Sequence, residues 1–428
     1  MTLRLLFLSL LLVRLCILLL FVLVDLFGSL GLSLSSLTKG PLIFAMARRT
    51  RAVFLATLLR SHFMVGLQLP PGPLIKVKFF LERAQLQETV AAELGAETPV
   101  IFATGTDAKQ QEILWRWVAS ATSATTMQPS VLAFPGLRGG KESQDLEALL
   151  SKAAPLVDAL GNDLIISRLI SDQYSMEALV MRSVSVNHSA NIVPSKEATF
   201  EDHVVRARLR HWVDRVLVRY RMCPFTESSK ISGVGLEEFG VAPAEIRYVE
   251  TNAATLPDLL ANFWQAVDSM LTEGDKEVSS IVMACPSWDN RWSAWYEDVF
   301  PLLEESVIVA KLSRTLGIVC FHPNYVTPSE TFLRKHRFGH MHPPRKLAAW
   351  VESSDSALAS KLSLPQLNWA GSYQRRSPHA MINVLWSHQL ELAENKRTSE
   401  NLYVRNIRRL LKEGIPKLER EAARERRR

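Results

Sequence analysis

The sequence has few cysteines for its length, and they are scattered. Four cysteines occur in 428 residues, and no two of them form a CxxC pair. A disulfide framework or a structural zinc module would need more cysteines at closer spacing, so the sequence argues against both. The glycine-rich stretch PGLRGGK (135–141) lacks the GxxxxGK[ST] frame, so it is not a phosphate-binding loop of that type. We therefore predict neither a metal nor a cofactor.

Acidic residues are almost absent from the first 81 residues. That segment has nine basic residues and one acid, Asp25, so it carries +8, and the other 347 residues sum to −1. The basic charge of the chain therefore belongs to its N-terminus. A nucleic-acid-binding domain would need a basic face of its own, so we predict no nucleic-acid partner.

The beginning of the chain is apolar enough to contact a membrane. Leu5–Val24 has 20 residues, about the length of a bilayer-spanning helix. Arg14 near its centre opposes a stable span, and Leu15–Val24 fits the apolar core of a signal peptide. Residues 26–81 are rich in arginine, serine and leucine, as organelle transit peptides are. Two interpretations stay open: a signal peptide (1–25) and a transit-like segment that lead to a plastid through a secretory step, or an N-terminal membrane anchor.

The rest of the chain divides at a polar linker near residues 186–197. Residues 82–185 have a mixed pattern and form a possible small subdomain, with helical periodicity in 108–119 and 145–160 and a strand-like run in 130–134. We expect a poorly ordered N-terminal region ahead of the C-terminal domain.

Residues 198–420 predict an α+β, possibly α/β, domain. Its opening helix repeats apolar residues at three- and four-residue spacing as far as Tyr220. Three apolar strand candidates follow, with a helical pattern in each gap: Ile246–Val249, Ile281–Ala284 and Gly317–Phe321. This spacing indicates β-α-β crossovers in a small sheet with helices packed on it. Further helices are expected over about 378–394 and 401–413, and then a solvated, charged tail (421–428).

Chemistry-bearing residues follow two of these strands. Cys285-Pro286 ends the second strand, and His322-Pro323 ends the third. If the strands are parallel, both residues lie at the carboxyl edge of the sheet, where open α/β sheets bind ligands. A cysteine–histidine pair can form an activated nucleophile. The alternative is that the cysteines are small buried hydrophobes and that His322 is a structural, hydrogen-bonded residue.

Three histidines occur between residues 336 and 342, which is a spacing that could suit a metal. No carboxylate or cysteine accompanies them, and the flanking residues are strongly basic. Cation binding is therefore disfavoured, and we predict an exposed basic loop over 333–346.

Four separated motifs together resemble a known family. They are LVRYRMCPFT (217–226), FHPNY (321–325), SYQRRSPHAMINVL (372–385) and YVRNIRRLLKEGI (403–415). Their order and approximate spacing are similar to those of the mainly bacterial domain of unknown function family 1415, over about residues 205–415. The resemblance implies an α+β scaffold and no established activity.

The chain departs from the family pattern at polar positions. Asn324 stands where the family has aspartate, Asn383 aligns with its histidine, and Trp386-Ser387 replace an Arg-Glu pair. An acid–base pair built on the missing groups could not operate here. The resemblance leaves two catalytic candidates, His322 and Cys223. It leaves six candidate substrate-binding residues: Arg376, Ser377, Tyr325, Tyr373, Arg405 and Asn406.

Two functions from different classes remain. The first is a non-catalytic binding or assembly role for an organelle-targeted protein, which the lost polar groups favour. The alternative is an enzyme acting on a small anionic substrate, with His322 as the acid–base or polarising group and Arg376 as the anion clamp. The expected partner is accordingly a small anionic molecule or another protein.

Overall fold

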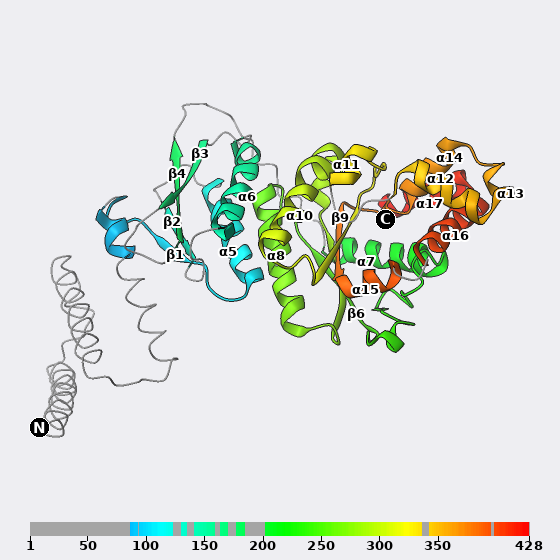
Figure 1. Ribbon diagram of the computed structural model, residues 1–428, viewed down its shortest axis with the longest axis horizontal. Coiled ribbons are helices and arrows are strands. Elements are labelled where there is room, and N and C mark those ends of the chain that lie inside the picture. The colour runs from blue at the N-terminus through cyan, green and yellow to red at the C-terminus, as the bar shows by residue number, and fades with distance from the viewer. Residues whose placement is uncertain are drawn as a thin grey trace, which may run out of the picture. The chain divides into compact units, whose positions relative to one another are not determined.

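A computed structural model of the protein describes residues 86–92, 94–122, 130–134, 141–158, 163–169, 177–184, 202–335, 342–394 and 398–427. The signal-like segment (1–25) and the transit-like segment (26–81) lie outside these residues. No helix in the described ranges has the length and apolar character needed to cross a bilayer. The chain divides into two units, Met1–Thr89 and Val90–Arg428, and the labelled elements of Figure 1 belong to the second.

The first sheet of this unit has four strands in the order β1-β2-β4-β3. Its strands are β1 (Val100–Phe102), β2 (Ser130–Phe134), β3 (Asp163–Leu169) and β4 (Glu177–Val184). β1 and β2 are parallel, and the other pairs are antiparallel. Helices α5 (Asp107–Thr122) and α6 (Lys141–Asp158) follow β1 and β2. The predicted strand at 130–134 and the two predicted helices are confirmed.

Helices α5 and α6 share a core with the C-terminal domain. Trp115 of α5 and Trp264 of α8 (Leu256–Glu273) are fully buried in the same apolar cluster. Thr106 also donates a hydrogen bond of 2.6 Å to Asp268. The possible subdomain within 82–185 is therefore packed against the helices of the second sheet.

The second sheet has five strands in the order β5-β6-β7-β9-β8. Its strands are β5 (Ile231–Ser232), β6 (Ala244–Glu250), β7 (Val278–Ala284), β8 (Leu316–Phe321) and β9 (Met381–Trp386). β6 and β7 are parallel, and α8 forms the crossover between them. β9 is antiparallel to both of its neighbours, so β7 and β8 point the same way. The three strands predicted from the sequence are confirmed, and the domain is α+β as expected.

The strand β9 corrects one prediction. The sequence indicated a helix over about 378–394, but the structure has β9 and then α15 (Ser387–Glu394). β9 is a central strand whose residues are buried or half-buried, and its run MINVLW is almost continuously apolar. A short apolar run of this kind does not distinguish a buried strand from a buried helix, because neither period is visible in it.

Helices cover both faces of the second sheet, which places the sheet between two apolar cores (Figure 1). Alternate residues of each strand face opposite cores, as the pleat requires. Ile318 and Cys320 of β8 belong to the core on the α8 side, whereas Val319 and Phe321 belong to the core on the α7 side. The α7 side is closed by α7 (Asp202–Trp212), the π-helix η1 (Val213–Arg219), α12 (Pro344–Ser354), α14 (Leu364–Tyr373) and α16 (Thr398–Glu413).

The helical segment after β7 is divided into several elements. Short helical turns η3 (Pro286–Trp288) and α9 (Trp292–Ala294) precede the π-helix η4 (Trp295–Val299), and α10 (Phe300–Val309) follows. Pro301 is the second residue of α10, which continues directly from η4.

The end of the chain is a packed helix. Gly414 has φ = 89° and separates α16 from α17 (Ile415–Arg427). The sequence predicted a solvated tail over 421–428, but Glu425 is only 4% exposed and Leu418 is fully buried. The carboxylate of Glu425 has an internal arginine partner, Arg215, which charge composition alone does not reveal.

Candidate functional site

His322 directly follows β8 and is fully buried. Its Nε2 lies 3.1 Å from the carbonyl oxygen of Trp288, and its Nδ1 lies 3.0 Å from the backbone nitrogen of Asn324. Since the carbonyl accepts and the backbone N–H donates, the ring is the neutral tautomer with its proton on Nε2. Trp292 and Trp295 pack around it, with ring centroids 5.0 and 6.1 Å away. Both ring nitrogens are therefore used in internal hydrogen bonds.

The surroundings of His322 keep the ring neutral. Burial lowers the pKa of His322 to about 4, although the hydrogen bond to Trp288 and the negative charge of Asp289 act in the opposite direction. A general acid–base group works best with a pKa near the operating pH and with a nitrogen that can reach the substrate. In this conformation His322 has neither property.

The two strand-end cysteines are packed inside the fold. Cys285 and Cys320 are fully buried, and burial raises the pKa of each thiol above its ordinary value. The indole Nε1 of Trp295 also donates a hydrogen bond of 2.9 Å to the Cys320 sulfur. Because the thiolate is the reactive form, this environment suppresses reactivity. Both residues fit the interpretation as small buried hydrophobes.

Cys223 lies in a turn that α16 holds in place. It is partly exposed and follows η1 by four residues. Arg405 donates a hydrogen bond of 2.7 Å to the carbonyl of Arg221, and the Asn406 amide donates one of 3.0 Å to the carbonyl of Met222. Arg405 and Asn406 thus fix the backbone before Cys223. These hydrogen bonds join the motif at 217–226 to the motif at 403–415. Both motifs therefore have a structural role.

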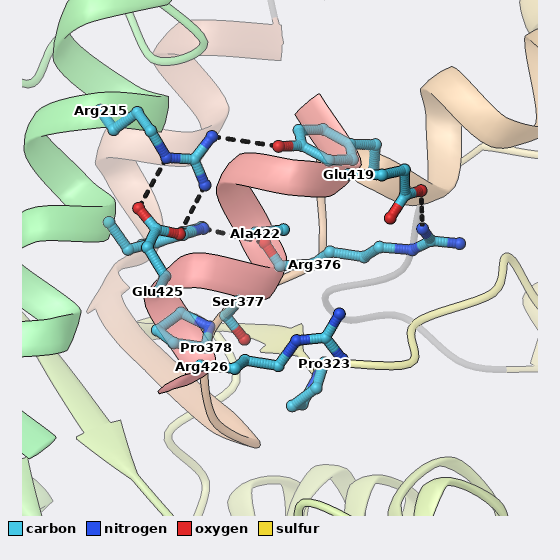
Figure 2. Close-up of a pocket in the computed structure, with 11 residues that line it drawn as sticks. Arg215, Pro323, Arg376, Ser377, Pro378, Glu419, Ala422, Glu425 and Arg426 are labelled. Atoms are coloured by element: carbon cyan, nitrogen blue, oxygen red, sulfur yellow. Dashed lines mark hydrogen bonds and ion pairs between the residues drawn. The ribbon is translucent and has the colours of Figure 1, made fainter. Parts of the chain in front are cut away.

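A pocket lies between the end of α14 and helix α17 (Figure 2). Three of the predicted binding residues line it: Tyr373, Arg376 and Ser377. Pro323 also lines the pocket, whereas His322 directly before it does not. The segment that follows β8 therefore reaches the pocket through Pro323, whereas the His322 side chain is bonded elsewhere.

A buried arginine organises the inner wall of this pocket. Arg215 of η1 is 5% exposed, and its Nε and Nη2 donate to the two carboxylate oxygens of Glu425 at 2.6 and 2.5 Å. Its Nη1 donates to the hydroxyl of Tyr373 at 3.0 Å, and that hydroxyl donates to the carbonyl of Leu418 at 3.2 Å. Burial alone lowers the pKa of Arg215, but the hydrogen bonds and charge of Glu425 outweigh it and raise the pKa.

Arg376 is held at the outer wall of the pocket. Its Nη1 donates to Glu419 at 2.7 Å, and its Nε donates to the carbonyl oxygen of Tyr325 at 3.3 Å. Ser377 donates its hydroxyl to the carbonyl of His379 at 2.5 Å. Arg376 therefore retains one guanidinium nitrogen, Nη2, without a hydrogen bond to any described residue.

The pocket is too narrow for a metabolite in this conformation. Its empty volume of about 290 Å³ includes the space at its open mouth. The enclosed part holds roughly one water molecule. A bound group must therefore be small, or it must reach in from the surface.

Sequence reasoning missed an acid–histidine pair beside this site. Asp289 Oδ2 lies 2.8 Å from Nδ1 of His379, and its Oδ1 accepts a hydrogen bond of 2.6 Å from the backbone N–H of Ala380. Asp289 thus ties the loop after β7 to the start of β9. His379 lies within the motif at 372–385, but Asp289 is 90 residues away in the sequence, and no local pattern joins the two residues.

The predicted site residues lie in three places instead of one. Tyr373, Arg376 and Ser377 line the pocket, His322 and Tyr325 are buried among tryptophans, and Cys223 lies beside Arg405 and Asn406. None of the contacts of His322 within the described residues includes Cys223. Their predicted catalytic and binding roles stay predictions, and the geometry gives them no shared reaction centre.

The end of the predicted basic loop is packed, which corrects the expectation of exposure there. The ring of His342 lies 4.7 Å from Trp350 and 5.0 Å from Tyr403, centroid to centroid. Burial and the charge of Lys346 lower the pKa of His342 to about 4. His336 and His340 lie outside the described residues. Within the described residues, no group of three or more His, Cys, Asp or Glu side chains could hold a metal ion.

These features define a mixed α+β domain in which His322 is buried and hydrogen-bonded through both ring nitrogens, beside a small pocket lined by charged residues. Residues 204–335 match the family described as "Protein of unknown function (DUF1415)". The resemblance predicted from the motifs is thereby confirmed over that range, and the motifs at 372–385 and 403–415 lie beyond it. No curated protein and no solved structure matches the chain.

Proposed function

We propose that the C-terminal domain is a non-catalytic binding or assembly domain. The observation that carries this proposal is the state of His322, whose two nitrogens are both committed to backbone groups. Its low pKa and the raised pKa values of Cys285 and Cys320 remove the acid, base and nucleophile that the strand ends would supply. The alternative, an enzyme using His322 and Arg376 on an anionic substrate, needs the two side chains to meet at one substrate.

Contacts around the retained motifs support a scaffold role. Arg376 binds a backbone carbonyl and a glutamate of the same chain, and Asn406 binds the carbonyl of Met222. These bonds join segments far apart in the sequence and fix the relative positions of η1, β8, α14 and α16. Such residues keep a surface rigid, which is what a binding partner needs.

Carbethoxylation of the full chain at pH 6, followed by mass spectrometry, tests the proposal. His211 is the internal control, because its side chain is 51% exposed. We expect rapid modification of His211 and none of His322 until the protein unfolds. A parallel thermal-shift screen of anionic metabolites should find no stabilisation that depends on His322. Modification of His322 at the rate of His211, with protection by a metabolite, would establish a working site and overturn the proposal.

A further inference from the structure

The acidic residues of helix α17 all have partners within the fold. Its three glutamates all point inward to partners of the same chain: Glu419 binds Arg376, Glu421 binds the hydroxyl of Tyr220, and Glu425 binds Arg215. The acidic residues of this helix are therefore neutralised or hydrogen-bonded within the fold.

Helix α17 has five cations, of which Lys417 pairs with Glu413 and the other four are arginines. Arg420, Arg424, Arg426 and Arg427 are exposed, and none has an ion pair or hydrogen bond with any residue that the structure describes. Arg420, Arg424 and Arg427 follow at i, i+4 and i+7, so they form one stripe along the helix. Like charges at this spacing repel one another. The stripe therefore raises the energy of the free protein unless an anion lies along it.

The helix dipole accounts for only part of this arrangement. Arginines in the last turn stabilise a helix by opposing its C-terminal partial charge, and this covers Arg424, Arg426 and Arg427. Arg420 lies about two turns before the end, beyond the reach of that effect. A role in recognition explains all four arginines.

One of the four arginines also reaches the pocket. Arg426 lines it together with Arg376 and Ser377, and Figure 2 shows the side chains of Arg426 and Arg376 extending in the same direction. Glu419 neutralises Arg376, but Arg426 has no carboxylate among the described residues. The Nη2 of Arg376 and the whole fork of Arg426 remain available to a small planar anion, and a carboxylate matches an arginine fork.

The chemistry of the helix favours an acidic protein segment. Four arginines are fewer than the six to ten phosphate contacts of a typical duplex-binding protein. α17 has no aromatic residue on which bases could stack, and the exposed large apolar residues of the described chain all lie elsewhere. Membrane insertion would need such an apolar face. An acidic segment needs neither aromatic residues nor an apolar face, because its carboxylates can bind the arginine stripe and the pocket.

We propose that the outward face of α17 is a docking surface for an acidic segment of a partner protein, which places one carboxylate in the pocket between Arg376 and Arg426. This inference rests on the proposed binding role and names the chemistry of the partner. The stripe formed by Arg420, Arg424 and Arg427 runs along the segment, and the pocket fixes its register.

Fluorescence anisotropy with the full chain and a labelled peptide of consecutive glutamates tests this surface. Arg426→Gln removes the charge at the pocket and should weaken binding about tenfold, the loss expected for a charge-assisted hydrogen bond. Arg424→Gln removes one stripe charge and should weaken it about threefold. Arg314→Gln is the matched control, because Arg314 is exposed and precedes β8 at the opposite end of the strand. It should leave binding unchanged, and the basic N-terminal segment is the same in all variants.

Three outcomes would overturn the docking surface. They are no binding of the peptide, an equal loss from Arg314→Gln and Arg426→Gln, and tighter binding of a DNA duplex of matched charge that depends on the same arginines. The last result would assign the surface to nucleic acid. If the peptide fails to bind while His322 resists carbethoxylation, the docking proposal is contradicted and the proposed non-catalytic role is retained. A reactive His322 overturns that role whatever the peptide does.

Discussion

His322 and Arg426 lie near the same edge of the sheet, and they differ in exposure, charge and hydrogen bonding. His322 is fully buried and uncharged, and it is hydrogen-bonded on both sides. Arg426 is exposed and charged, and it has no partner among the described residues. The motif residue therefore stabilises the fold, whereas the residue outside the motifs is free to bind. Agreement with a family pattern and availability for chemistry are separate properties.

The largest effect should come from the inward face of α17. Glu425→Gln leaves Arg215 buried without its bidentate carboxylate, and loss of one partner of a buried pair costs about 3 kcal/mol or more. Urea unfolding followed by tryptophan fluorescence measures this change. The control is the double variant Arg215→Met/Glu425→Leu, which removes both charges and should recover most of the stability. A loss below about 1 kcal/mol for Glu425→Gln would contradict the buried ion pair.

The second effect is a fall in stability at mildly acidic pH. The folded pKa of His322, about 4, lies below its ordinary value of 6.5, so the unfolded state binds more protons between these values. Stability is therefore complete above pH 6.5 and is lost as the pH falls toward 4. The loss from His322 should reach about 2 kcal/mol at pH 5. His342 contributes in the same direction over the same window.

Urea unfolding at pH 7.5 and at pH 5 measures this dependence. His342→Phe should remove the contribution of His342 and leave that of His322. A free energy of unfolding that stays constant from pH 7.5 to pH 5 in this variant would contradict the buried neutral ring.

A smaller effect is expected at the pair that joins β7 to β9. Asp289→Asn keeps an acceptor for the backbone N–H of Ala380 but removes the charge beside His379, so stability should fall by about 1–2 kcal/mol. Asp298→Asn is a suitable control, because Asp298 lies in the π-helix η4 away from this pair. Equal losses in the two variants would show that the bond between Asp289 and His379 contributes nothing specific.

The smallest change in stability should come from the outward face. Arg424→Gln should leave the free energy of unfolding within about 0.5 kcal/mol of the starting value, because the side chain is exposed and has no ion pair with a described residue. The same substitution should weaken binding of the glutamate peptide. A variant that lost stability and binding together would show that the stripe is part of the fold, and the contrast between the two faces would fail.

The sequence predicts the strands and helices of this domain well where their periodicity is clear. α8 and β6 were recognisable because polar and apolar residues alternate at helix or strand spacing. β9 was not, because a central strand covered on both faces shows no alternation. The motifs at 217–226 and 321–325 lie within the residues that match the family.

The site was less predictable, because its bonds join distant residues. Arg215 and Glu425 are 210 residues apart, and Asp289 and His379 are 90 apart. His322 could be placed at a strand end from sequence, but the orientation of its ring depends on the carbonyl of Trp288 in another segment. Whether a polar residue is free or already bonded is a tertiary property, and no local pattern encodes it.

The central claim is that His322 is a neutral, structural residue, and a nitrogen NMR titration of the histidine rings tests it most directly. We predict that His322 keeps its proton on Nε2 and stays uncharged down to about pH 4, where its pKa lies. A His322 ring that takes up its second proton between pH 6 and 7 would contradict the account.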